Sequence, residues 1–366
     1  MNMKAEKIIA RAPEPRAAVR SMKEYHPPLA DREGLRLDFN ENTSGCSPCV
    51  LAKLQQIAAD QLARYPERAP MERALCTHFQ IDHLQLLLTN GVDEAIHLMC
   101  ETYLNPEDEV IIPVPTFGMY EVYASQTGAK VITVQAKNDL AVPVKKIMQA
   151  VTAKTKLICV ASPNNPTGSV LSRADLIEIL HKVPHTAFLL DEAYYDFYGE
   201  TRLDLIVKFP NLFIARTFSK AYGMAGFRVG VLMGARDTMA DVRKVSSPYN
   251  VNGIALACLE AAMADDKYIR EYTSQVIAGR NMLEQELTAL GLRWWPSKAN
   301  FVLFRVGDKH AALVDAMRAR GILIRSRHKD PGCSGCVRIT LGTSEHTARM
   351  LAALREAAIE LELGRK

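Results

Sequence analysis

The sequence predicts an α/β fold, in which a mostly parallel sheet carries helices on both faces. Through the middle of the chain, short apolar runs typical of buried strands alternate with longer stretches typical of helices. Turn-forming residues, rich in glycine, proline and asparagine, follow several of the strands. The length of 366 residues exceeds what one hydrophobic core usually supports, so two domains are expected.

Composition and charge exclude several classes of partner. The chain is 48% hydrophobic and 23% charged, as in an ordinary globular protein. A net charge of +4 is small for this length and no basic block is present, so no nucleic-acid partner is expected. No apolar run reaches the length of a membrane span and the first residues lack a signal-peptide core, which favours a cytoplasmic protein without a membrane partner.

The N-terminal segment is expected to be an arm rather than a core element. The first 35 residues are polar and contain several prolines. A short strand is predicted at Leu35–Phe39, followed by a run of turn formers. A helix is then predicted from Ser47 to about Ala63, because serine is a good N-cap and Pro48 suits the first helical turn.

Seven strands are predicted in the central part of the chain, at Leu84–Leu88, Glu109–Val114, Lys130–Val134, Lys156–Ala161, Ala187–Leu190, Leu212–Arg216 and Arg228–Leu232. Ligands of open α/β sheets bind beyond the carboxyl ends of the strands. Residues that follow these strands should therefore converge on one rim of the sheet. They are Gly91, Val92, Asp93, Phe117, Asn165, Asp191, Tyr194 and Lys220.

The pattern changes beyond residue 250. A long helical stretch from Gly253 to Leu290, interrupted near Asp265, is expected to bridge two domains. Strands are predicted at Leu292–Trp295, Phe301–Val306, Leu323–Ser326 and Val337–Leu341, with helices at His310–Arg320 and Glu345–Leu363. We expect an arm and part of the small domain in residues 1–40, a large domain in 41–260 and a small α+β domain in 261–366.

Lys220 stands out because of its neighbours. It follows Thr217 and Ser219 in a segment rich in small residues, and Arg228 lies eight positions on. A lysine amine can form a Schiff base with an aldehyde when nearby cations lower its pKa. Hydroxyl groups and an arginine suit a phosphate. An aldehyde with a phosphate is pyridoxal 5′-phosphate; the alternative is an exposed loop lysine beside a core segment.

The eight cysteines include two pairs with the spacing of zinc ligands. These are Cys46 with Cys49 and Cys333 with Cys336, which lie at opposite ends of the chain. Zinc modules usually bring their pairs within a few tens of residues. We therefore expect reduced, structural thiols and no metal site.

A series of short motifs runs in one order through residues 20–355. They are Asn40-Glu41-Asn42, Arg64-Tyr65-Pro66, Pro115-Thr116-Phe117-Gly118-Met119-Tyr120, Ser162-Pro163-Asn164-Asn165-Pro166-Thr167-Gly168, Asp191-Glu192-Ala193-Tyr194, Thr217-Phe218-Ser219-Lys220, Gly321-Ile322-Leu323-Ile324-Arg325 and Ser334–Thr340. Together they resemble the fold-type I pyridoxal-phosphate aminotransferases, and the fit is best for the histidinol-phosphate aminotransferase family. Phe117 and Thr43 depart from the tyrosine and proline that are common in this family.

This resemblance implies a seven-stranded large-domain sheet and a role for each rim residue. Lys220 would hold the cofactor and move a proton, and Asp191 would face the pyridine nitrogen. Asn165 and Tyr194 would bind the ring 3′-oxygen, and Phe117 would stack on the ring. The cofactor phosphate would be bound by Gly91, Val92, Asp93, Thr217, Ser219 and Arg228, with Tyr65 reaching it across a homodimer interface.

The resemblance also implies where the substrate lies. Tyr25, Asn42, Arg325 and Arg338 would face it, and Asn300 is a further candidate for the lining of the site. The expected reaction is amino transfer between glutamate/2-oxoglutarate and histidinol phosphate, a step of histidine biosynthesis. An aromatic or other broad-specificity aminotransferase, a threonine-phosphate decarboxylase of the same fold and a non-catalytic sensor module remain open as alternatives.

Overall fold

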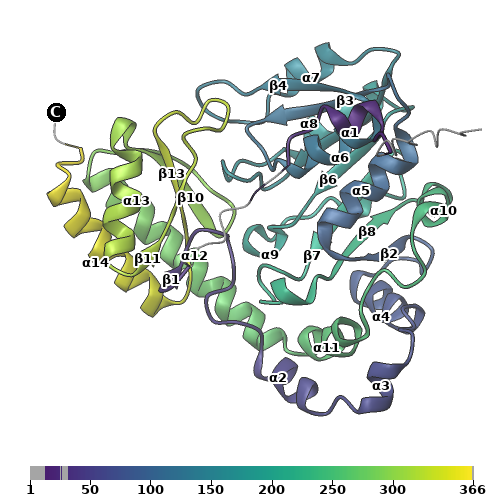
Figure 1. Cartoon of the computed structure of the whole chain (residues 1–366), viewed down its shortest axis with the longest axis horizontal. Coiled ribbons are helices and arrows are strands. Elements are labelled where there is room, and N and C mark those ends of the chain that lie inside the picture. Colours follow the sequence, from purple (N-terminus) through teal and green to yellow (C-terminus); the bar gives the residue numbers. More distant parts are fainter. Residues whose placement is uncertain (1–12, 25, 27–31, 365–366) are drawn as a thin grey trace, which may run out of the picture.

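A computed structural model describes residues 13–24, 26 and 32–364 of the chain, and its largest sheet has seven strands (Figure 1). These are β2 (Leu86–Thr89), β3 (Glu109–Val114), β4 (Lys130–Gln135), β5 (Thr155–Ala161), β6 (Ala187–Asp191), β7 (Leu212–Thr217) and β8 (Gly230–Gly234). Their order is β2-β8-β7-β6-β5-β3-β4. All neighbours are parallel except β8, which is antiparallel to β7 and β2. The expected mostly parallel, seven-stranded sheet is confirmed.

Helices cover both faces of this sheet because its strands are apolar on both sides. Leu86 and Leu88 belong to the core on one face, and Leu87 between them belongs to the core on the other, as the two-residue period of a strand requires. The first face packs against α4 (Ala69–Phe79), α7 (Val144–Ala150), α8 (Arg173–Lys182) and α11 (Gly253–Ala264). The second packs against α5 (Gly91–Tyr103), α6 (Met119–Thr127) and α10 (Arg236–Val245).

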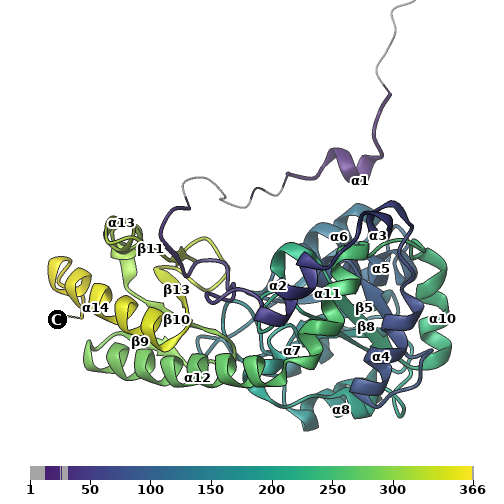
Figure 2. The same ribbon diagram turned by 90° about the horizontal axis from the view of Figure 1, so that it is seen from below.

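The C-terminal part forms a smaller α+β layer. Its antiparallel sheet has the order β12-β13-β10-β9, with β9 at Arg293–Trp295, β10 at Phe301–Arg305, β12 at Arg325–Ser326 and β13 at Cys336–Thr340. Helices α12 (Asp266–Ala289), α13 (His310–Ala319) and α14 (Ser344–Glu360) pack against it. Figure 2 shows α12 running from the large sheet's side of the molecule along the base of this layer.

The N-terminal segment crosses between the two parts. Strand β1 (Leu35–Arg36) pairs in parallel with β11 (Ile322–Leu323), so the residues after it enter the space between the layers. Two further helices are short, α1 (Ala17–Arg20) and α9 (Tyr195–Tyr198). None of the helices described is both long and apolar enough to cross a membrane.

The single helix expected at the start of the large domain is two helices in the structure. Instead of continuing from Ser47 to Ala63, the chain forms α2 (Pro48–Gln55) and α3 (Ala59–Ala63). Ile57 packs against the core between them, and Ala58 adopts an extended conformation in which its N–H donates to the Gln61 side chain. Packing of the partly buried Ile57 against the core therefore interrupts the helix that the sequence pattern predicts.

Candidate active site

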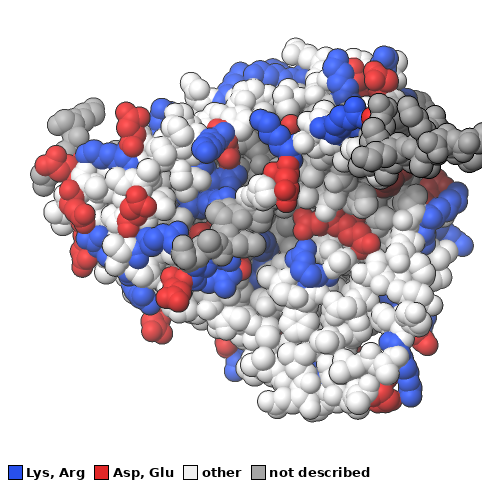
Figure 3. Space-filling view, viewed as in Figure 1, with Lys and Arg blue, Asp and Glu red and all other residues white. Residues whose placement is uncertain are grey.

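A cavity of about 610 Å³ opens between the carboxyl ends of the parallel strands and the smaller layer. Figure 3 shows this face of the molecule, where basic side chains gather beside the central hollow. The cavity brings together predicted site residues from strands far apart in the sequence: Val92, Asp93, Phe117, Asn165, Asp191, Tyr194, Thr217, Ser219, Lys220, Arg228, Arg325 and Arg338. Convergence on one rim follows from the parallel order of the strands.

Lys220 projects into this cavity from the loop after β7. Its Nζ donates a hydrogen bond to the Phe39 carbonyl at 3.2 Å. Loss of hydration lowers the pKa of Lys220 to about 8, and the Arg338 and Arg228 guanidinium groups act in the same direction. A lysine in this range has a substantial neutral fraction near neutral pH, which is the form that attacks an aldehyde and accepts a proton.

Asp191 ends β6 at the floor of the cavity and is only 4% exposed. Burial raises its pKa to about 6, although hydrogen bonds from the Tyr120 hydroxyl at 2.5 Å and the Ala193 N–H at 2.8 Å favour the charged form. A buried carboxylate of this kind is stabilised by a cation, such as a protonated ring nitrogen. Tyr120 stands in the predicted Phe117 motif, but its position in the sequence did not indicate that it would reach Asp191.

Tyr194 is held by a residue that the sequence analysis did not select. The Asn40 Nδ2 donates to the Tyr194 hydroxyl at 2.8 Å, and the Thr340 hydroxyl donates to Asn40 Oδ1 at 3.1 Å. Asn300 lies behind them, where its Nδ2 donates to the Asn40 carbonyl at 3.2 Å, so it is buried rather than on the cavity wall. Asn40 belongs to the Asn40-Glu41-Asn42 motif, which was the available signal.

An anion cradle lies at the N-terminus of α5. Gly91 has a positive φ of 73°, and a Cβ placed there would come within 2.7 Å of the Arg228 guanidinium. Arg228 donates to Asp93 at 2.9 Å, and the Thr217 hydroxyl donates to Ser219 Oγ at 2.9 Å. Backbone N–H groups at a helix N-terminus, two hydroxyls and a guanidinium are donors suited to a phosphate.

Arg325 and Arg338 face each other across the β12–β13 ladder on the opposite wall. Arg338 is buried, and it donates to the Asp38 carbonyl at 2.5 Å and to Asn165 Oδ1. Burial lowers the pKa of Arg338 to about 9, with further contributions from neighbouring arginines. The Arg325 guanidinium lies 5.4 Å from the centre of the Phe39 ring. The site therefore has a second cationic region, apart from the cradle at Gly91.

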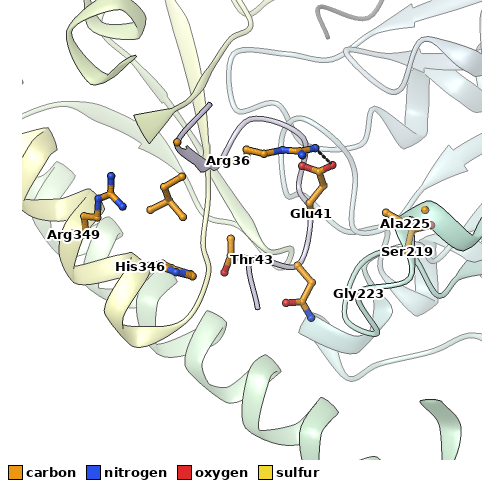
Figure 4. A pocket seen from close by; sticks show the side chains of 12 residues that line it. Arg36, Glu41, Thr43, Ser219, Gly223, Ala225, His346 and Arg349 are labelled. Atoms are coloured by element: carbon orange, nitrogen blue, oxygen red, sulfur yellow. Dashed lines mark hydrogen bonds and ion pairs between the residues drawn. The ribbon is translucent and has the colours of Figure 1, made fainter. Parts of the chain in front are cut away.

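Two expected residues are placed elsewhere. Asn42 donates to the Ala221 carbonyl and lines a separate hollow of about 500 Å³ (Figure 4), in which Arg36 pairs with Glu41 at 2.6 Å. Tyr65 is 78% exposed and stacks on Tyr249, with ring centres 4.6 Å apart. Tyr25 lies outside the described residues.

All eight cysteines are free thiols. Cys333 and Cys336 are buried in a small apolar cluster with Trp295 and Leu303, whereas Cys49 is exposed. Within the described part of the chain, no group of three or more metal-binding side chains could hold a metal ion.

Comparisons with known proteins agree on one family. The model of the class I and II aminotransferases matches residues 32–354. A histidinol-phosphate aminotransferase of Symbiobacterium thermophilum is 36% identical, over 93% of this chain and 98% of that protein. One from Geobacillus sp. is 33% identical, over 90% and 91%. A crystal structure of the Sinorhizobium meliloti histidinol-phosphate aminotransferase with pyridoxal 5′-phosphate superimposes with a TM-score of 0.87, at 25% identity and over 96% and 99% of the two chains.

Proposed function

The chain belongs to the class I and II aminotransferases, and on this premise we propose that it transfers an amino group between glutamate/2-oxoglutarate and histidinol phosphate. Pyridoxal 5′-phosphate is the cofactor of this family. The observation that carries the proposal is one cavity that contains a lysine of lowered pKa, a buried carboxylate, an anion cradle and a separate pair of arginines. Such an arrangement has a place for the cofactor and a second anion site for the substrate.

The residues present fit the cofactor. Gly91 leaves room beside Arg228 where any Cβ would obstruct the cradle, so the phosphate would bind there with Thr217 and Ser219. Asp191 would pair with the ring nitrogen, Asn165 and Tyr194 would bind the ring oxygen, and Phe117 would cover a face of the ring. When bound, the cofactor supplies an electron sink for the amino carbon of the substrate.

Lys220 would then act on the substrate itself. In its neutral form the amine would take a proton from the substrate carbon that bears nitrogen and would hold this proton for its later return. Burial, together with the cationic neighbours Arg338 and Arg228, lowers the pKa of the amine and keeps it neutral enough for this task. The same residue would serve both half-reactions. Both substrates would use one cavity in turn, the first product leaving before the second substrate binds, which is a ping-pong exchange.

Arg338 and Arg325 would hold the anionic end of each substrate. Histidinol phosphate has no carboxylate next to its amino carbon, so its phosphate is its anionic group, whereas glutamate has two carboxylates. Guanidinium groups bind either anion through paired N–H donors. We expect Tyr25 to contribute from the N-terminal segment.

Arginine variants are expected to separate the two substrates. Arg338→Ala should lower kcat/KM in both half-reactions, about 10- to 150-fold per lost charge-assisted contact. Arg325→Ala should lower kcat/KM more for histidinol phosphate than for glutamate. Single-turnover rates with histidinol phosphate and with glutamate would measure this, with bound-cofactor absorbance as the folding control. An Arg325→Ala variant that handles histidinol phosphate as well as the wild type would contradict this role.

We propose further that the active form is a homodimer in the cytoplasm. Tyr65 and Tyr249 stack on each other and are exposed, as are Leu62 in α3 and Ile254 in α11, two helices that contact each other. Such exposed apolar side chains favour association. The resemblance of Arg64-Tyr65-Pro66 to the family's motif implies that Tyr65 would reach the cofactor phosphate of the second copy in such a dimer. The free state of all eight cysteines suits a reducing compartment.

Tyr65→Phe is expected to weaken cofactor retention without loss of the fold, because a hydrogen bond to a charged group contributes about 1.5–3 kcal/mol. Dialysis followed by absorbance of the remaining cofactor would measure the loss, and Tyr249→Phe at the stacked neighbour is the matched control. An active monomer in sedimentation would exclude this role for Tyr65.

A further inference from the structure

Arg327 is a cationic residue of the same cavity that has no place in the mechanism above. It lies two positions after Arg325, and residues two apart in an extended chain point to the same side. Arg325 pairs with Arg338 across the sheet, and the Arg327 N–H continues the ladder by donating to the Cys336 carbonyl at 2.8 Å. The register thus brings three guanidinium groups to one wall.

One N–H group of the Arg327 side chain lacks a hydrogen-bond acceptor in the described part of the chain. Its side chain is 16% exposed and pairs with Asp330, which is 23% exposed. The Nε–H groups of Arg327 and Arg338 have no hydrogen-bond acceptor among the described residues. Buried donors in proteins rarely remain without a partner. Arg327 is also the charged neighbour that most lowers the pKa of Arg338, which places the two guanidinium groups close together.

A phosphate monoester fits this wall better than a carboxylate does. It carries close to two negative charges near neutral pH and presents three acceptor oxygens, whereas a carboxylate carries one charge and two oxygens. Asp330 supplies one carboxylate to the wall, at a turn in which its N–H donates to the Arg327 carbonyl at 3.0 Å. In this structure the Asp330 carboxylate forms an ion pair with the Arg327 guanidinium.

We propose that Arg327 is a specificity-determining residue that binds the substrate phosphate, and that Asp330 is an internal anion which the phosphate displaces from it. The proposal rests on the proposed function, since it concerns the phosphorylated substrate. Arg327 then adds to the affinity for a dianion, while Asp330 reduces the affinity for any incoming anion. A substrate with a single carboxylate gains less from displacing Asp330, so the pair raises discrimination for phosphate.

A purely structural ion pair makes a different prediction. If Arg327 and Asp330 only brace the loop between β12 and β13, losing either partner should harm the enzyme in the same way. If Arg327 binds the phosphate and Asp330 competes with it, Arg327→Gln and Asp330→Asn should act in opposite directions. The sign of the Asp330 effect therefore separates a ligand role from bracing.

The test compares kcat and KM for histidinol phosphate and for histidinol, which lacks the phosphate. Arg327→Gln should reduce the preference for the phosphorylated substrate about 10- to 150-fold, mainly through KM, with little change for histidinol. Asp330→Asn should lower the KM for histidinol phosphate and strengthen inhibition by inorganic phosphate. Lys298→Gln removes one positive charge from an exposed position that does not line the cavity, and it should change the preference less than about threefold.

Three results would overturn the inference, and the first of them would overturn the proposed function as well. If the wild type does not prefer histidinol phosphate to histidinol, the proposed function is wrong and Arg327 loses its ligand. If the wild type has that preference but Arg327→Gln keeps it, or if Arg327→Gln and Asp330→Asn lose it together, the role of Arg327 alone is wrong.

Discussion

A Lys220→Ala variant is expected to lose amino transfer by about 10⁴-fold or more while it still binds the cofactor. A positioned general base contributes up to about 10⁴-fold, and the variant also loses the covalent attachment point. Cofactor binding should persist because the cradle at Gly91 and Arg228 and the carboxylate of Asp191 do not depend on the lysine. Initial rates and the absorbance of bound cofactor in the dialysed protein would measure both effects.

Chemical labelling gives this prediction its control. Borohydride reduction of the wild type should attach the cofactor to the peptide that contains Lys220, as read by mass spectrometry. The exposed Lys208 provides a matched variant, Lys208→Ala, that should keep both activity and label. Label on another lysine in the wild type would refute the assignment of Lys220.

Asp191→Asn is expected to lower kcat by about 10²- to 10³-fold, the loss typical when a buried electrostatic partner of a transition state is removed. Asparagine matches the shape of aspartate and can still accept from the Ala193 N–H, but it cannot stabilise a protonated ring nitrogen. Single-turnover rates with glutamate would measure the loss. A variant with wild-type kcat would show that the carboxylate does not support the chemistry.

The same substitution should stabilise the protein without cofactor. Burial raises the pKa of Asp191 to about 6 in the folded state, above the value near 4 of an unfolded aspartate. The folded state therefore binds this proton more tightly, and the free energy of unfolding falls as pH rises from about 4 to about 6. At pH 8, Asp191→Asn should raise the free energy of unfolding by up to about 3 kcal/mol. At pH 4 the variant and the wild type should have nearly the same free energy of unfolding. Thermal melts of the cofactor-free proteins at the two pH values would test this.

The sequence was sufficient to predict the main sheet and most of its rim. Strands such as β5 and β6 are short apolar runs with turn formers behind them, so their positions could be predicted to within about two residues. Ligands of a parallel sheet bind beyond the carboxyl ends of its strands. Asp191 and Lys220 both follow such ends in the sequence, so they could be predicted to lie in one site.

Contacts between distant segments could not be predicted in this way. Asn40 meets Tyr194 across 154 positions, and Arg338 meets Asn165 across 173, so these pairs depend on how the two layers pack. Likewise, Arg327 reaches the cavity because of the register between β12 and β13, which the apolar pattern does not specify. The break between α2 and α3 depends on the tertiary burial of Ile57.

Half-reaction spectra of the wild-type protein test the central claim most directly. Separate single-turnover experiments with glutamate, histidinol phosphate, phenylalanine and threonine phosphate would follow the absorbance change when each amine donates its nitrogen to the bound cofactor. We expect glutamate and histidinol phosphate to convert the enzyme fully, and phenylalanine and threonine phosphate to convert it much more slowly. Equal rates with phenylalanine would favour a broad aromatic aminotransferase, and no conversion by histidinol phosphate would contradict the proposed function.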